Sequence, residues 1–145
     1  MVNKRFWLEI LVFVLVFGMT VVGCDNDSTD GSTDPALNGI WIQDGHGECT
    51  YNNGNWEDRW DGNPYAKGIY TTNNGEMTTK TTHLWGNGEP LNLVAKWYTK
   101  AELQALNIPN LESMMTDGYT RTYSVNGNSI TFTDKSGYTY TWTRK

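Results

Sequence analysis

His46, Glu48 and Cys49 are close neighbours in the chain, and they carry side-chain types that zinc binds in proteins. The other histidine, His83, is distant along the sequence. A zinc site would need a further ligand, so the simpler interpretation is two polar histidines on strands or turns. Cys49 is then a small buried apolar residue. We therefore expect no metal site.

A second group combines three carboxylates with two indole rings. Glu57, Asp58 and Asp61 lie beside Trp56 and Trp60 in a stretch rich in Gly and Asn. Carboxylate pairs next to aromatic rings occur in glycosidase clefts, but carboxylates on one short loop rarely keep the separation that the reaction requires. The pattern favours a solvated acidic loop whose Trp residues pack on the fold beneath it.

The sequence motifs of common enzyme classes are absent. The chain contains no Gly-x-Ser-x-Gly, no His-Glu-x-x-His and no phosphate-binding loop. We therefore expect a protein that is not an enzyme and that carries no cofactor.

The N-terminus has the composition of an export signal. Lys4 and Arg5 give a basic start, residues 6–22 are almost wholly apolar, and Gly23 precedes Cys24. This arrangement resembles the lipobox of bacterial lipoproteins. The resemblance implies that residues 1–23 are a signal peptide and that the Cys24 thiol receives a diacylglycerol. Cleavage then leaves Cys24 as the first residue of the mature protein.

Two other fates of the leader remain open, namely a transmembrane anchor and simple secretion. An anchor made of residues 6–22 would have 17 residues with Glu9 among them, which is short for a bilayer span. The segment that follows, residues 25–30, is acidic, whereas an anchor would favour a basic flank. Lipid anchoring is therefore favoured. It predicts a location in the cell envelope, at the outer membrane or cell surface more than at the inner membrane.

Charge and cysteine content limit the partners and the crosslinks of the mature chain. Removal of the leader leaves 9 basic and 15 acidic residues, a net charge of −6. Nucleic-acid binding depends on Lys and Arg contacts to phosphate, so no nucleic-acid partner is expected. With Cys24 lipidated, Cys49 has no partner for an intramolecular disulfide.

The mature chain divides into a tether and one folded domain. Residues 24–36 begin with the lipidated Cys and continue mostly with Asp, Asn, Ser, Thr and Gly, which predicts a flexible tether. The 109 residues from 37 to 145 are enough for one hydrophobic core.

The folded domain is rich in Thr, Tyr and Trp, with regular Gly and Asn clusters, as in a β protein. Alternating residue types predict a three-stranded meander over 119–125, 129–133 and 138–143, with tight turns between the strands. Further strands are predicted at 40–44, 48–52, 67–72, 76–84 and 91–98. Residues 52–64 fit no strand.

One helix is predicted between the strands. Thr99 and Glu102 form the pattern of a capping box, and Leu103, Leu106 and Ile108 supply an apolar side. Residues 111–115 either add a second helical turn or form a lid.

About eight antiparallel strands in a short chain would leave two long bare edges unless the sheet closes. We therefore predict a mainly β fold, a small antiparallel up-and-down β-barrel with one short helix. An open sandwich is the alternative.

Both ends of the domain resemble the lipocalin and calycin barrels. Gly39 and Trp41 form a Gly-x-Trp in the first strand, and residues 123–132 are similar to the C-terminal hairpin of bacterial lipocalin-like lipoproteins. The resemblance implies that Trp41 closes the base of the barrel and packs under an Arg from the end of the chain. Arg144 is the expected partner, with Arg121 as the alternative.

Six of the seven Trp residues lie in the mature chain. Alternation places Trp97 and Trp142 in the core. Trp56, Trp60 and Trp85 fall in turn-rich stretches, where aromatic side chains at a barrel mouth would suit a ligand or a glycan. The alternative is that these three pack as a small cluster under long loops.

Two functional hypotheses follow. In the first, a lipid-anchored lipocalin-like protein binds a small apolar or amphipathic ligand in the barrel or at its mouth. In the second, a structural or interaction lipoprotein with a filled barrel contacts an envelope protein, a host protein or a glycan through its loops. An open apolar cavity would favour the first hypothesis, and a barrel filled by Tyr and Trp would favour the second. A monomer is expected in both.

Overall fold

The computed structural model of this chain describes residues 31–43, 45, 47–88 and 93–145. The predicted signal peptide, Cys24 and His46 lie outside the described residues. The described residues form one 3-10 helix, nine strands and two short α-helices. In chain order they are η1 (Pro35–Leu37), β1 (Gly39–Gln43), β2 (Gly47–Asn52), β3 (Asn55–Trp60), β4 (Asn63–Asn73), β5 (Glu76–Gly88), β6 (Leu93–Thr99), α2 (Lys100–Ala105), α3 (Leu111–Met114), β7 (Asp117–Asn126), β8 (Ser129–Thr133) and β9 (Thr139–Arg144).

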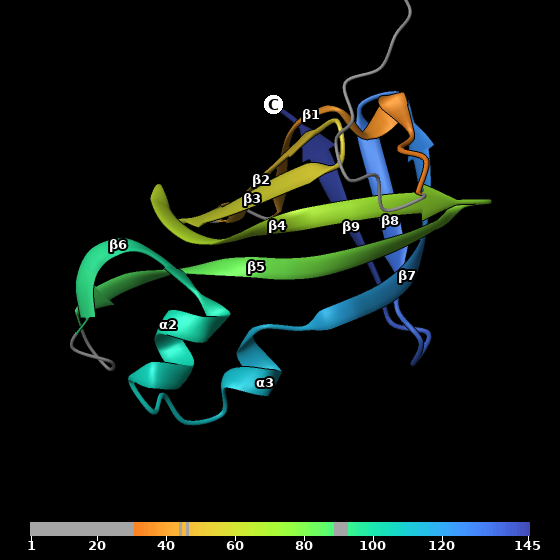
Figure 1. Ribbon diagram of the computed structural model, residues 1–145. Coiled ribbons are helices and arrows are strands. Elements are labelled where there is room, and N and C mark those ends of the chain that lie inside the picture. Colours follow the sequence, from red (N-terminus) through yellow and green to blue (C-terminus); the bar gives the residue numbers. More distant parts are fainter. Residues whose placement is uncertain (1–30, 44, 46, 89–92) are drawn as a thin grey trace, which may run out of the picture. The chain divides into compact units, whose positions relative to one another are not determined.

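Eight of these strands close into a barrel (Figure 1). Neighbouring strands follow the order β4-β3-β2-β1-β9-β8-β7-β5, and β5 also pairs with β4. All of the pairings are antiparallel. The predicted up-and-down barrel is confirmed, and the open sandwich is wrong. Closure satisfies the backbone groups that two bare edges would have exposed.

The ninth strand, β6, pairs with β5. β5 is 13 residues long, so its first part pairs with β7 and its second part pairs with β6. After β5 the chain leaves the barrel and forms β6, α2 and α3 before it returns as β7 (Figure 1). The capping box at the start of α2 is confirmed: the Thr99 hydroxyl accepts from the Glu102 N–H, and the Glu102 carboxylate accepts from the Thr99 N–H.

The prediction that residues 52–64 contain no strand is wrong, because Asn55–Trp60 is β3. β3 pairs with β2 along its whole length and with β4 on its other side. Asp58 lies opposite Cys49 and Ala66, which are both buried, so Asp58 shares their inward face. An acidic residue at an inward position interrupts the apolar alternation by which a strand is recognised.

The barrel closes where β1 meets β9, and Trp41 lies opposite Arg144 in that pairing. The Arg144 guanidinium lies 4.4 Å from the centre of the Trp41 ring. It also donates to the backbone carbonyls of Asn38 and Ala36, each at 2.9 Å. Trp41 is fully buried, and its Nε1–H donates to the Leu37 carbonyl at 2.7 Å. This contact joins the first strand, the last strand and η1.

Gly39 belongs to the same contact. It has a φ of 139°, and a Cβ atom there would lie 2.9 Å from Nη1 of Arg144. Gly39, Trp41 and Arg144 therefore meet at the seam. Arg121, the alternative partner, points into the barrel from β7 and contacts a different set of rings.

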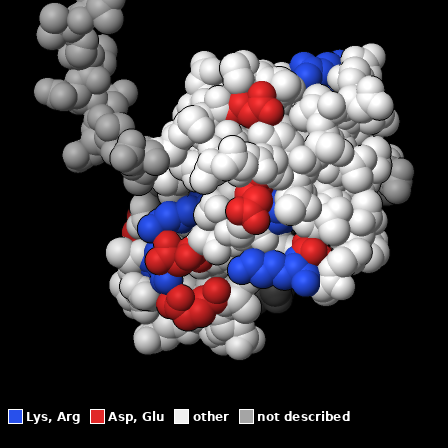
Figure 2. All heavy atoms as spheres, turned by 90° about the vertical axis from the view of Figure 1, so that its right-hand side faces the viewer, with Lys and Arg blue, Asp and Glu red and all other residues white. Residues whose placement is uncertain are grey.

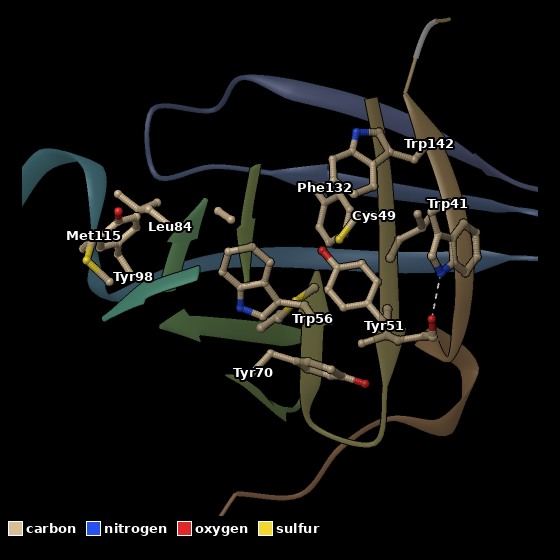
Figure 3. Close-up of a cluster of buried hydrophobic side chains, with 14 of the residues drawn as sticks. Trp41, Cys49, Tyr51, Trp56, Tyr70, Leu84, Tyr98, Met115, Phe132 and Trp142 are labelled. Atoms are coloured by element: carbon tan, nitrogen blue, oxygen red, sulfur yellow. Dashed lines mark hydrogen bonds between the residues drawn. The ribbon is translucent and has the colours of Figure 1, made fainter. Parts of the chain in front are cut away.

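Aromatic side chains fill the middle of the barrel (Figure 3). Tyr51 packs edge-on against Tyr70 with ring centres 5.2 Å apart, and Phe132 packs against Trp142 at 5.4 Å. The buried apolar residues of the barrel interior include Trp41, Cys49, Tyr51, Trp56, Ala66, Tyr70, Met77, Ile130, Phe132 and Trp142. The same core continues between β5, β6 and the two helices through Leu84, Tyr98, Leu103, Leu111 and Met115.

The chain enters the barrel at the end where the β2–β3 and β4–β5 turns lie, which we call the closed end. The Ser32 hydroxyl donates to the Thr72 carbonyl at 2.8 Å, and the Thr72 N–H donates to the Ser32 carbonyl at 2.7 Å. The Tyr123 hydroxyl donates to the Asp34 carboxylate at 2.9 Å. Residues 31–36, which the sequence assigns to the tether, thus lie against the barrel.

Positive and negative side chains are neighbours on the face shown in Figure 2, and they form no large patch of one sign there. Lys80 pairs with Asp117 at 2.7 Å, and Lys100 pairs with Glu112 at 2.6 Å. Among the described residues, no helix has both the length and the apolar character needed to span a bilayer.

Candidate functional site

The three Trp residues proposed as ligand contacts lie in three different surroundings. Trp56 is 9% exposed, points into the barrel, and donates its Nε1–H to the Ile69 carbonyl at 3.1 Å. Trp60, at the end of β3, is 55% exposed. Trp85 lies on β5 and packs against Trp97 with ring centres 5.3 Å apart. All three lie on strands and not in turns, and they form no common surface.

Trp97, the partner of Trp85, is not in the core as the sequence predicted. Trp97 was expected in the core, but it is half-buried on β6 and the Lys67 ammonium lies 4.5 Å from the centre of its ring. Trp142 is 8% exposed and belongs to the core, as expected.

The acidic group of the sequence is divided between the two faces of β3 and the turn that follows it. Glu57 points outward and pairs with Arg59 at 3.0 Å, whereas Asp58 points inward. Asp61 lies in the β3–β4 turn with a φ of 48°. The expectation of one solvated acidic loop is wrong, because side chains alternate between the faces of a strand. A pair of catalytic carboxylates on one face is not formed by Glu57 and Asp58.

A pocket of about 190 Å³ opens at the barrel end opposite the closed end. We call it the mouth pocket. It is lined by residues at the far ends of β1, β2 and β3 and by neighbours on β4 and β9. The lining residues are Gln43, Gly47, Glu48, Asp58, Arg59, Trp60, Tyr65 and Trp142.

Two aromatic rings of the mouth pocket are exposed and one is buried. Trp60 and Tyr65 are 55% and 59% exposed, while Trp142 forms part of the core beneath them. Large aromatic side chains kept in contact with water at a concave site are typical of a ligand surface. Of the three Trp residues proposed from the sequence, Trp60 lines this pocket.

A chain of polar side chains runs from the mouth pocket into the barrel. The Asp58 carboxylate contacts the Cys49 thiol, and that thiol contacts the Tyr51 hydroxyl (Figure 3 shows the Cys49 sulfur beside this hydroxyl). The Tyr51 hydroxyl then accepts from Arg121 Nη2 at 2.9 Å. Arg121 Nη1 donates to the Tyr140 hydroxyl at 2.5 Å, and its guanidinium lies 4.0 Å from the centre of the Phe132 ring.

Burial determines the protonation states of the Cys49 thiol and the Tyr51 hydroxyl in this row of polar side chains. Burial raises the pKa of the Cys49 thiol well above its usual range, and the Asp58 charge raises it further. Burial likewise raises the pKa of the Tyr51 hydroxyl. Both groups therefore stay protonated at neutral pH. A neutral buried thiol is a poor nucleophile, so Cys49 is not arranged for covalent chemistry.

Burial also raises the pKa of the Asp58 carboxyl, while contact with the Cys49 thiol and the charge of Arg121 lower it. Among the described residues, no Lys or Arg side chain is within ion-pair distance of Asp58. The other charged residues that line the pocket are paired: Glu48 with Lys145 at 2.8 Å, and Arg59 with Glu57 at 3.0 Å. Asp58 is therefore the charge at this site that the protein leaves least compensated.

Two buried donors beside this site lack acceptors. Trp142 Nε1 and Arg121 Nε make no hydrogen bond among the described residues. An unsatisfied buried donor costs about 1–3 kcal/mol of stability. A core optimised for stability alone would avoid such groups, and uncompensated polar groups in a concave site favour a functional role.

The Asp58→Asn variant is expected to remove a pH-dependent loss of stability. The carboxyl has a higher pKa in the folded than in the unfolded protein, so its ionisation destabilises the fold. The free energy of unfolding of the wild type should fall as the pH rises from about 4 through the raised folded pKa, and it should stay lower above it. The variant should be more stable than the wild type at pH 7. Urea denaturation at several pH values measures both effects.

The matched control is Glu57→Gln, on the outward face of the same strand. We expect this variant to stay within about 0.5 kcal/mol of the wild type, because surface charges contribute little. An Asp58→Asn curve parallel to the wild-type curve over the whole pH range would contradict the assignment of that dependence to Asp58.

The candidate metal ligands that the sequence offered, against which no metal site was expected, are not brought together among the described residues. Within the described residues, no group of three His, Cys, Asp or Glu side chains could hold a metal ion. Glu48 and Cys49 point to opposite faces of β2, and His46 lies outside the described residues. His83 lies on β5, where Nδ1 is 2.9 Å from the Thr82 hydroxyl.

Sequence reasoning did not identify Asp58 as an inward residue, and it did not identify Tyr65 or Arg121 as part of a site. One signal was present. Trp56, Asp58 and Trp60 are spaced at every second residue, which is the period of a strand face. An acidic residue between two Trp residues of one strand face indicates a carboxylate held among aromatic rings.

Comparisons with models of protein families, with curated proteins and with solved structures found no match for this chain. Its class therefore follows from its fold. It is a closed eight-stranded antiparallel β-barrel with one additional strand, two short α-helices and a small pocket at the barrel mouth.

Proposed function

We propose that this protein is an exported lipoprotein, anchored in the cell envelope through a lipid on Cys24, whose barrel binds a small amphipathic ligand at its mouth. The lipocalin-like character of the barrel supports the binding role, and the leader with Gly23 before Cys24 supports the anchor. No enzymatic activity is proposed, because Cys49 is a neutral thiol and Glu57 and Asp58 point to opposite faces.

The observation that carries the binding role is the mouth pocket. Tyr51, Tyr70 and Phe132 fill the middle of the barrel, which by the criterion set from the sequence disfavours a ligand inside it and favours the interaction hypothesis. The binding role is therefore proposed for the mouth alone. The mouth pocket, by contrast, combines the exposed rings of Trp60 and Tyr65 with the Asp58 carboxylate. Apolar walls with a few polar groups are the usual composition of a small-molecule site.

The position of the tether supports an outward-facing mouth. Ser32 is bound to Thr72 at the closed end, and the mouth pocket lies at the opposite end. Residues 24–30 can extend at most ~25 Å between the lipid and Gly31. The closed end would thus stay near the membrane while the mouth faces the surrounding solution.

Native mass spectrometry tests the binding role. The sample is residues 24–145 with Cys24→Ala, secreted by its own host behind a signal peptide that is cleaved without lipid attachment, and purified gently. We expect additional mass that leaves on mild organic extraction. Trp60→Ala should lose this mass, because Trp60 lines the mouth pocket, and Trp85→Ala should keep it, because Trp85 packs on Trp97 instead.

A second candidate function is an interaction lipoprotein that contacts another protein. Apolar side chains favour it: Val94 on β6 is 74% exposed, Leu106 is 50% exposed and Met114 is 37% exposed. A bare mass in the experiment above, with no uptake from a lipid and pigment extract, would contradict the ligand role and favour this one. Glycan binding through Trp56, Trp60 and Trp85 together is not proposed, because the three lie apart.

A further inference from the structure

We propose that the ligand group held in the mouth pocket is a small organic cation, a protonated amine or a quaternary ammonium, placed between the Asp58 carboxylate and the rings of Trp60 and Tyr65. This inference rests on the proposed binding role of the pocket and specifies its chemistry. It follows from charge, from ring exposure and from size.

The charge of the pocket favours a cation. Glu48 and Arg59 are each paired with a neighbour outside the pocket, at 2.8 Å and 3.0 Å. Asp58 contacts an uncharged thiol, and Arg121, the cation inside the barrel whose charge acts on it, donates its hydrogen bonds to Tyr51 and Tyr140. A bound cation would supply the missing counter-charge, whereas a bound anion would meet an acidic floor.

The rings of the pocket favour the same class of ligand. Trp60 and Tyr65 each expose more than half of their surface and both line the pocket, so their rings can contact a bound ligand. The face of an aromatic ring attracts a cation, and Trp is the strongest of the three aromatic residues in this respect. The protein already uses this contact elsewhere, since Arg144 lies 4.4 Å from Trp41 and Lys96 lies 4.5 Å from Tyr98.

The size of the pocket limits the group that it can take. A volume of about 190 Å³ is below the ~300–1,000 Å³ that encloses a drug-sized ligand, so the pocket suits one end of a molecule. A single trimethylammonium or protonated amine with a short carbon chain fits this description. A bare metal ion does not, because Asp58 is the one unpaired carboxylate among the lining residues.

The test uses three probes of similar shape and different charge. Benzylammonium, benzyl alcohol and benzoate are titrated into residues 24–145 with Cys24→Ala, and the indole N–H signals are followed by NMR. We expect the ammonium to bind at least tenfold more tightly than the other two. Asp58→Asn should weaken ammonium binding at least tenfold, and Trp60→Ala should weaken it severalfold.

The control is Glu76→Gln, which removes an exposed carboxylate at the start of β5, at the closed end of the barrel, and should leave binding unchanged. Urea denaturation confirms that each variant is folded. Equal binding of ammonium and alcohol, or no effect of Asp58→Asn, would contradict the cation assignment and leave the pocket as a binding site. Binding of none of the three probes would overturn the cation assignment, and if the protein from its host also carried no mass, the binding role would fail with it.

Discussion

Trp41→Ala is expected to lower the free energy of unfolding by about 4 kcal/mol, which is the usual range for removing a fully buried Trp. Trp41 has no exposed surface, and it supports the guanidinium of Arg144 at the seam of the barrel. Its loss also removes the hydrogen bond to the Leu37 carbonyl. Since small domains are stable by about 5–15 kcal/mol, this one change should remove much of the total. Urea denaturation followed by circular dichroism measures it.

Two variants distinguish the contribution of the seam contact to stability from the general cost of removing a Trp side chain. Trp41→Phe keeps a ring under Arg144 but loses the Nε1–H donor, and it should cost about 1–2 kcal/mol. Trp85→Ala removes a Trp that packs on Trp97 outside the barrel interior, and it should cost clearly less than Trp41→Ala. Equal losses for Trp41→Ala and Trp85→Ala would contradict the special role of the seam. Trp41→Phe remains measurable if Trp41→Ala does not fold.

Cys24→Ala in the full-length chain is expected to abolish lipid attachment completely. The lipobox resemblance makes the Cys24 thiol the acceptor of the diacylglycerol and places cleavage directly before it. Each buried methylene of an acyl chain contributes about 0.8 kcal/mol to membrane binding, so the wild type should be held firmly. Intact-mass measurement should find a lipidated protein beginning at residue 24 in the wild type, and neither the lipid mass nor that cleavage in the variant.

The chain contains a matched control for this experiment. Cys49 is the other cysteine of the mature protein, and it is buried inside the barrel at 2% exposure. Cys49→Ala should keep the lipid and the cleavage site. Lipid on the Cys24→Ala protein, or its loss from Cys49→Ala, would refute the assignment of Cys24.

Much of the barrel was predictable because its strands obey a simple period. The alternation over 129–133 and 138–143 correctly predicted β8 and β9, although Tyr138 is 66% exposed and β9 begins at Thr139. The capping box at Thr99 likewise predicted the start of α2, since it depends on residues three positions apart. Local patterns of this kind are readable without knowledge of the rest of the chain.

The site was not predictable in the same way. Asp58 looked like a residue of a solvated loop, because carboxylates are rarely buried. Its inward position follows from the pairing of β3 with β2 and β4, and that pairing brings Cys49 and Ala66 to either side of it. Tyr51 and Arg121 are 70 residues apart in the chain, and no local pattern indicates that their side chains meet at 2.9 Å.

The sequence by itself determined the class of the domain and the residues that meet at the barrel seam, and it predicts a leader that ends before Cys24. These depend on periodicity, on composition and on one short motif. Closure of the barrel decided the rest: that Tyr51, Tyr70 and Phe132 fill its middle, and that Asp58, Trp60 and Tyr65 surround a small pocket at its mouth. The physical reason is that burial and electrostatics depend on distances between strands that are far apart in the sequence. These distances are set when the first and last strands pair and close the barrel.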